Sequence, residues 1–197
     1  MLRRDDLLAV AARHFSHGYA ATSVRGIARE LGVSQSAVQH HAPTKDALFA
    51  AVIDEVIVPR LAQARGLAAA LADAPGDPAE QVAVLVRSRM DTLVAQGGIV
   101  LTVMSDTSPG AEQRRERLLA AISTQRNAAL GALSTMAERG VTRPVSVTAW
   151  TVLSIAAIPA IAQAWPMLER LGPDLVVDRA AVLDEIADLL VRGLLPR

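Results

Sequence analysis

The amino-acid sequence predicts an all-α protein of about nine helices, with a three-helix N-terminal domain and a larger helical C-terminal domain. Apolar residues recur every three or four positions along most of the chain, whereas the strict alternation typical of strands is scarce. Alanine, the residue with the highest helix propensity, is abundant. The 197 residues are 51% hydrophobic and 20% charged, a composition too apolar for a disordered chain and sufficient for a sizeable core.

Three short helices are expected in the first 50 residues, each bounded by a capping or helix-breaking residue. They cover about 3–17, 24–31 and 35–41. Serines precede the second and third helices as N-caps, and a glycine follows the first and the second, where the chain must turn. Pro43 closes the third helix, because proline does not extend a preceding helix.

Longer helices are expected after residue 44. Their ranges are about 45–71, 78–97, 109–139, 145–171 and 179–192. Pro59 is expected to bend or break the first of these helices, since it lacks a backbone N–H and its ring clashes with the preceding turn. Gly97-Gly98 is expected to end the second helix, with a short apolar segment over 99–105 behind it.

Charge is unevenly distributed although it totals zero. Residues 1–50 carry six basic and four acidic side chains, or +2, which leaves 14 basic and 16 acidic side chains, or −2, in the remainder. All four histidines and the single lysine, Lys45, also lie in this first segment. A positive segment followed by a negative one predicts two domains with different tasks, which we place at 1–50 and 51–197.

The stretch most informative about function is 22–41, which predicts two short helices joined by a tight turn at Gly32. Ala28 is small enough for the second helix to cross closely over the first. The shared apolar centre is expected to contain Ile27, Leu31, Val33 and Val38. An ordinary pair of packed helices gives the same pattern, but the polar face of 35–41 contains no carboxylate. That absence favours a helix-turn-helix whose second helix faces phosphates and base edges.

Residues from about 3 to 55 resemble the DNA-binding domain of the tetracycline-repressor (TetR) family of bacterial regulators. The matching positions are collinear and correctly spaced: Ala11, Ala12, His14, Phe15, Gly18, Tyr19, Thr22, Ser23, Val24, Ile27, Ala28, Leu31, Gly32, Val33, Ser34, Val38, His41, Pro43, Thr44, Lys45 and Leu48. Beyond residue 55 the likeness is limited to the number of helices and to the ending Ile186–Leu194. Gln39 and Ala42 depart from the family, which usually has a phosphate-contacting tyrosine and an aromatic residue at these positions.

The resemblance implies a transcriptional regulator, by default a repressor, that binds a near-palindromic operator in double-stranded DNA as a homodimer. Lys45 opens a helix where the family places a phosphate contact. The residues expected to contact DNA are Thr22, Ser23, Ser34, Gln35, Ser36, Gln39, His40, His41 and Lys45. The base-edge candidates among them are Gln35, Ser36, Gln39 and His40. Thr22 and Ser23 have helix capping as an alternative role, and one residue can do both.

The resemblance also implies a C-terminal domain that dimerises and binds a small effector, which releases the regulator from DNA. Helices over 145–171 and 179–194 are expected to form the homodimer interface, because the first carries no charge up to residue 168 and the second has an apolar stripe. The candidate pocket residues, for which core packing is the alternative, are Met90, Leu93, Val100, Met104, Trp150 and Trp165. Such a lining predicts an apolar or aromatic ligand.

Other classes of protein are less favoured. The charge-free span 144–168 is long enough to cross a bilayer, but two prolines and several polar residues interrupt it. The start of the sequence lacks an export signal, which favours a cytoplasmic protein. There is no cysteine, no phosphate-binding glycine loop and no metal-like spacing, so neither an enzyme nor a metal or other cofactor is expected. A helical binding or scaffold protein without DNA-binding activity is the remaining alternative.

Overall fold

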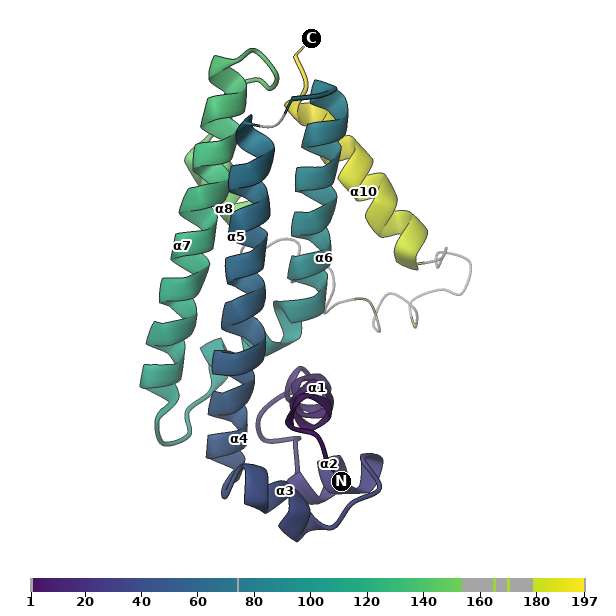
Figure 1. Cartoon of the computed structure of the whole chain (residues 1–197), viewed down its shortest axis with the longest axis vertical. Helices are drawn as coiled ribbons and strands as arrows, with labels where there is room; N and C mark the ends of the chain where they lie inside the picture. The colour runs from purple at the N-terminus through teal and green to yellow at the C-terminus, as the bar shows by residue number, and fades with distance from the viewer. Residues whose placement is uncertain (1, 74, 154–164, 166–169, 171–178, 197) are drawn as a thin grey trace. The chain divides into compact units, whose positions relative to one another are not determined.

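The computed structural model describes residues 2–73, 75–153, 165, 170 and 179–196. Regular secondary structure in these ranges is entirely helical (Figure 1), which confirms the predicted fold class. The helices are α1 (Arg4–Phe15), α2 (Val24–Glu30), α3 (Gln35–His41), α4 (Lys45–Val52), the π-helix η1 (Ile53–Ile57), α5 (Val58–Asp73), α6 (Pro78–Ser105), α7 (Ala111–Glu138), α8 (Val147–Val152) and α10 (Arg179–Leu194).

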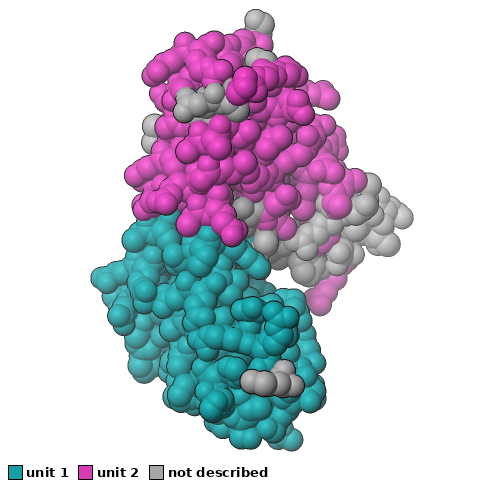
Figure 2. Space-filling view, in the orientation of Figure 1, with its two compact units in different colours: residues 1–61, 96–122 teal, residues 62–95, 123–197 magenta. Residues whose placement is uncertain are grey.

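The chain divides into two compact units (Figure 2). Unit 1 contains residues 1–61 and 96–122, so it combines the N-terminal helices with the end of α6 and the beginning of α7. Unit 2 contains residues 62–95 and 123–197. This structural division differs from the functional division at residue 50, which stays a prediction.

The N-terminal helices begin at the predicted capping residues. Ser23, Ser34 and Thr44 each accept a hydrogen bond on the side-chain oxygen from the backbone N–H three residues ahead, at 3.0, 3.2 and 3.0 Å. Between α2 and α3, Gly32 has a φ of +66°, a left-handed conformation that side chains disfavour. The sequence signals for this turn therefore act through the local chemistry that was expected of them.

Aromatic and aliphatic side chains form the core of unit 1. The rings of Phe15 on α1 and Phe49 on α4 have centroids 4.4 Å apart, and both side chains are completely buried. Ile27 of α2 and Val38 of α3 are also completely buried, so the two helices that flank the turn are anchored in the same core. This burial fixes which face of α3 remains available to solvent.

Two sets of ion pairs tie α1 to its neighbours. Arg4 donates from Nε and Nη2 to the two carboxylate oxygens of Glu55 in η1, at 2.7 and 2.5 Å. Glu30 at the end of α2 receives Arg13 at 2.5 Å and lies 2.7 Å from Nε2 of His14. These hydrogen bonds, those from Arg13 most, lower the pKa of Glu30.

Two proposed helix breaks have different outcomes. Near Pro59 the regular α-helix is interrupted by the π-helix η1, which ends two residues before the proline, so the expected disturbance is observed. The predicted end at Gly97-Gly98 is wrong, because α6 continues to Ser105. Both glycines are buried, and Ile99 beyond them is 2% exposed, so tertiary packing overrides their poor helix propensity.

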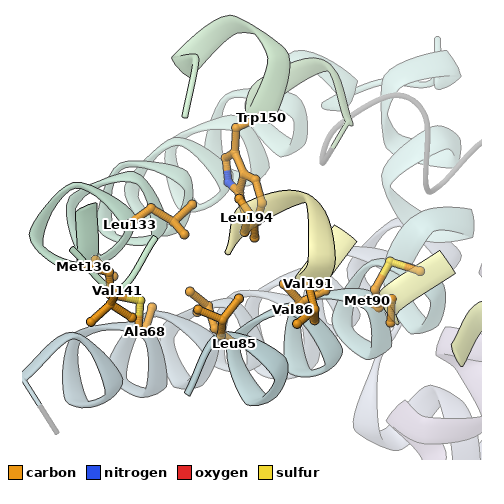
Figure 3. Close-up of a cluster of buried hydrophobic side chains, with 13 residues drawn as sticks. Ala68, Leu85, Val86, Met90, Leu133, Met136, Val141, Trp150, Val191 and Leu194 are labelled. Atoms are coloured by element: carbon orange, nitrogen blue, oxygen red, sulfur yellow. The ribbon is translucent and has the colours of Figure 1, made fainter. Parts of the chain in front are cut away.

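Unit 2 has its own hydrophobic cluster, to which α5, α6, α7, α8 and α10 contribute (Figure 3). Its largest members are Leu85, Val86, Met90, Leu133, Met136, Trp150, Val191 and Leu194. In the described residues no helix is both long and apolar enough to span a bilayer. Most of the charge-free span 144–168, on which the membrane alternative depended, lies outside those residues.

Candidate nucleic-acid interface

The site begins with α3, which directly follows the turn at Gly32. Val38 is completely buried and Ala42, just after the helix, is 4% exposed, so one side of α3 is packed into unit 1. The predicted base-edge residues lie on the surface: Gln35, Ser36, Gln39 and His40 are all exposed. No carboxylate occurs on this helix. The arrangement presents amide, hydroxyl and imidazole groups to a partner outside the chain.

Other predicted DNA contacts have structural roles in unit 1. Thr22 is 4% exposed, and its hydroxyl lies 2.9 Å from the carbonyl oxygens of both His14 and Gly18. It therefore joins the end of α1 to the start of α2 from inside the unit. His41 is half-buried, and its carbonyl oxygen accepts a hydrogen bond from Arg4 at 3.0 Å. DNA contacts by these two residues stay predictions.

Lys45, at the first position of α4, is placed by an aromatic ring. Its Nζ lies 4.2 Å from the centroid of the Tyr19 ring, a cation–π contact. The Tyr19 hydroxyl donates to Asp46 at 2.5 Å. Burial, with the hydrogen bond to Asp46 second, raises the pKa of Tyr19 to about 12, so the ring is a neutral phenol at neutral pH.

Two arginines on α2 were missed as candidate site residues. Arg25 and Arg29 are exposed and are four positions apart, so they share one face of the helix. In the part of the chain that the structure describes, neither has a carboxylate partner, whereas Arg4 and Arg13 do. The signal that sequence reasoning overlooked was this spacing, on the helix that precedes the turn.

The candidate pocket residues are not gathered around one cavity. Val100 and Met104 are half-buried and belong to unit 1. In unit 2, Met90 lines a groove of about 250 Å³ between α6 and α10, and Trp150 lines a separate cavity of about 10 Å³. Trp165 is 7% exposed, and the side chain of Leu93 is outside the described part of the structure.

A helix-turn-helix followed by a helical C-terminal unit is the architecture of a class of bacterial DNA-binding regulators. Residues 7–52 match the family model described as "Bacterial regulatory proteins, tetR family". The predicted resemblance is thus confirmed, and the N-terminal segment of this chain is a TetR-family domain. A comparison with curated proteins found no match.

Solved structures of transcriptional regulators share the fold over almost the whole chain. The ketosteroid regulator KstR2 of Mycobacterium tuberculosis is 20% identical with a TM-score of 0.68, and the alignment covers 100% of this chain and 96% of that one. A TetR/AcrR regulator from Thermobifida fusca is 21% identical, with a TM-score of 0.63 and 97% of both chains covered. FadR from Bacillus subtilis, solved with stearoyl-CoA, is 15% identical with a TM-score of 0.60, covering 97% of this chain and 99% of that one.

Proposed function

We propose that this protein is a DNA-binding transcriptional regulator, by default a repressor, that reads operator DNA with α3. The observation that carries the proposal is the polar, carboxylate-free face of α3, exposed next to the turn at Gly32 while Val38 anchors the opposite side. Gln35 and Gln39 have side-chain amides that bond adenine through two hydrogen bonds in the major groove. The proposal includes no catalytic step, and a regulator of this kind acts in the cytoplasm.

Positive groups around α3 support contacts to phosphates. Lys45 begins α4, and the exposed Arg25 and Arg29 lie on α2 without a carboxylate partner in the described ranges. Ser23 and Ser34 lie at helix starts, where hydroxyl and backbone N–H groups favour a phosphate. These contacts position the protein on the duplex, whereas α3 supplies the sequence preference.

We further propose that the functional form is a homodimer, with 145–171 and 179–194 at its interface. Large apolar side chains on both helices support this surface, since Val152 is 56% and Leu189 is 62% exposed in the single chain. A two-fold dimer presents two copies of α3 to half-sites one helical turn apart on a near-palindromic operator.

A small, largely apolar effector is the proposed signal. The fold analogues offer support by analogy, because KstR2 is described as a ketosteroid regulator and FadR was solved with stearoyl-CoA. In this mechanism DNA favours one spacing of the two α3 helices and the ligand favours another, with α4 as the connecting lever. The ligand weakens DNA binding only through its different affinities for the two states.

The decisive experiment is selection of duplexes from a random library by the purified full chain. The expected product is an enriched, nearly palindromic sequence with half-sites about 10 base pairs apart. Failure to retain any duplex at low salt would refute the proposal and favour a helical binding protein without DNA-binding activity. Enrichment of a single unrepeated half-site would leave DNA binding intact and refute the dimeric mode.

A further inference from the structure

An arginine without a counter-charge lies inside unit 2. Arg89 on α6 is 6% exposed, and its Nε and Nη1 atoms are buried without a hydrogen-bond partner. No ion pair joins Arg89 to a carboxylate, and burial lowers its pKa to about 10. The guanidinium is therefore still charged at neutral pH. A buried charge normally has a partner, because removal from water costs several kcal/mol that only a partner offsets.

The surroundings of Arg89 contain two further unpaired polar atoms. Arg89 lines the cavity of about 10 Å³ together with Gln125 of α7 and Trp150 of α8. The Nε1 of Trp150 and the Oε1 of Gln125 are buried and unbonded. A cavity that contains the donors of an arginine and of an indole is complementary to an acceptor that carries negative charge.

The remaining wall of the cavity is apolar. Leu67 and Ala68 of α5, Leu85 of α6 and Ala129 of α7 complete it. A hydrated inorganic anion gains little from such a wall, whereas a molecule with a hydrocarbon body buries apolar surface there. The combined lining therefore suits an amphipathic anion better than a purely apolar molecule.

We propose that unit 2 binds a small amphipathic carboxylic acid, whose carboxylate pairs with Arg89 and whose apolar body lies between α5, α6 and α7. Trp150 Nε1 donates a further hydrogen bond to the same carboxylate. The inference deepens the proposed function and rests on it for the role of this ligand as effector, but not for the binding itself.

The size of the cavity sets a condition on entry. A volume of about 10 Å³ accommodates roughly one water molecule, so a larger ligand must displace the surrounding side chains. Binding then moves packed side chains of α5, α6 and α7 in unit 2. It gives the ligand different affinities for the closed and the widened states, which an effector requires.

The test uses the DNA-free full chain and three probes with the same alkyl chain: decanoate, decanol and decylammonium. Titration calorimetry, with tryptophan fluorescence as a second readout, is expected to show decanoate binding about 10- to 100-fold more tightly than decanol, and no binding of decylammonium. The Arg89→Met variant is expected to lose the preference for the acid. Arg65→Met, which removes an exposed arginine beside the lining residue Ala64, is the matched control and is expected to retain it.

Thermal unfolding separates a binding role from a structural one. Without ligand, Arg89→Met is expected to unfold at the same or a higher temperature than wild type, because it replaces an unpaired buried charge by an apolar side chain. A large drop in unfolding temperature would overturn the proposal, since it would give Arg89 a stabilising partner within the protein.

Three binding results would also overturn the proposal: equal affinity for acid and alcohol, an acid preference retained by Arg89→Met, or no binding by acids from hexanoate to hexadecanoate. These outcomes are independent of operator selection. Decanoate binding without DNA binding would uphold the ligand site and refute the regulator, and the reverse pattern would do the opposite.

Discussion

Arg114 holds Asp106 in a buried ion pair within unit 1, with Nε and Nη2 donating to the same carboxylate oxygen at 3.2 and 2.7 Å. The two side chains are only 8% and 2% exposed. Arg114 also donates to the Ser108 hydroxyl at 2.6 Å, and its guanidinium carbon lies 5.5 Å from the centroid of the Phe49 ring. One side chain thus joins the α6–α7 connection to α4, the helix that begins with Lys45.

Replacing Arg114 by alanine is expected to destabilise the protein strongly, by about 3–5 kcal/mol, because Asp106 is left buried without its counter-charge. Urea unfolding monitored by circular dichroism measures the loss. Arg117→Ala is the matched control on the same helix, since Arg117 is 58% exposed and pairs with Asp54 at 2.9 Å. Its expected cost is at most about 1 kcal/mol. Similar losses in both variants would contradict a special role for the buried pair.

The same pair predicts a dependence of stability on acid. Burial alone would raise the pKa of Asp106, but hydrogen bonds from Arg114 and Ser108 outweigh it and hold the pKa below 3.8. A carboxyl group with a lowered folded-state pKa contributes stability above its unfolded pKa, and that contribution disappears as pH falls through the folded value. The urea midpoint is therefore expected to fall below about pH 4. Asp106→Asn should flatten this decline, and an unaltered pH profile would rule out Asp106 as a source.

Gln39 is expected to read one base pair of the operator. Gln39→Ala should cost about 1–3 kcal/mol on the matched operator and relax selection at a single position, because the exposed amide no longer bonds a base edge. Fluorescence anisotropy on matched and scrambled duplexes measures both effects. Equal losses on the two duplexes would indicate that Gln39 contacts the backbone instead.

Lys45 is expected to contact a phosphate and to carry no sequence information. Lys45→Ala should weaken binding to all duplexes by a similar factor and reduce the slope of log affinity against log salt by about one per site. Arg25→Ala should behave in the same way. Arg65→Ala in unit 2 is the control, and a salt slope in Lys45→Ala that matches this control would exclude the phosphate contact.

Leu189 is expected to lie in the homodimer interface. Leu189→Glu places a charge on the exposed apolar face of α10 and should raise the dimer dissociation constant at least about tenfold, since a buried unpaired carboxylate is costly. Analytical ultracentrifugation measures the change. Arg192→Glu, an exposed charge reversal on the same helix, controls for altered net charge. A Leu189→Glu protein that dimerises normally would place the interface elsewhere.

The parts of the site that local chemistry determines were predictable. Ser34 before α3 and Gly32 in the turn are signals read from a few neighbouring residues, and the structure uses both as expected. Contacts between distant segments were not predictable from spacing. The burial of Thr22 and the isolation of Arg89 both depend on packing against other helices, and no periodicity in the sequence distinguishes Arg89 from an exposed arginine.

The contact between Lys45 and Tyr19 has a chemical consequence for the whole molecule. Because Lys45 is the single lysine in the sequence, acylation of lysine side chains has one target, the ammonium group above that ring. An acyl group would neutralise it and remove the cation–π attraction at the first turn of α4. A reaction that modifies many sites on most proteins is, on this chain, a substitution at one atom.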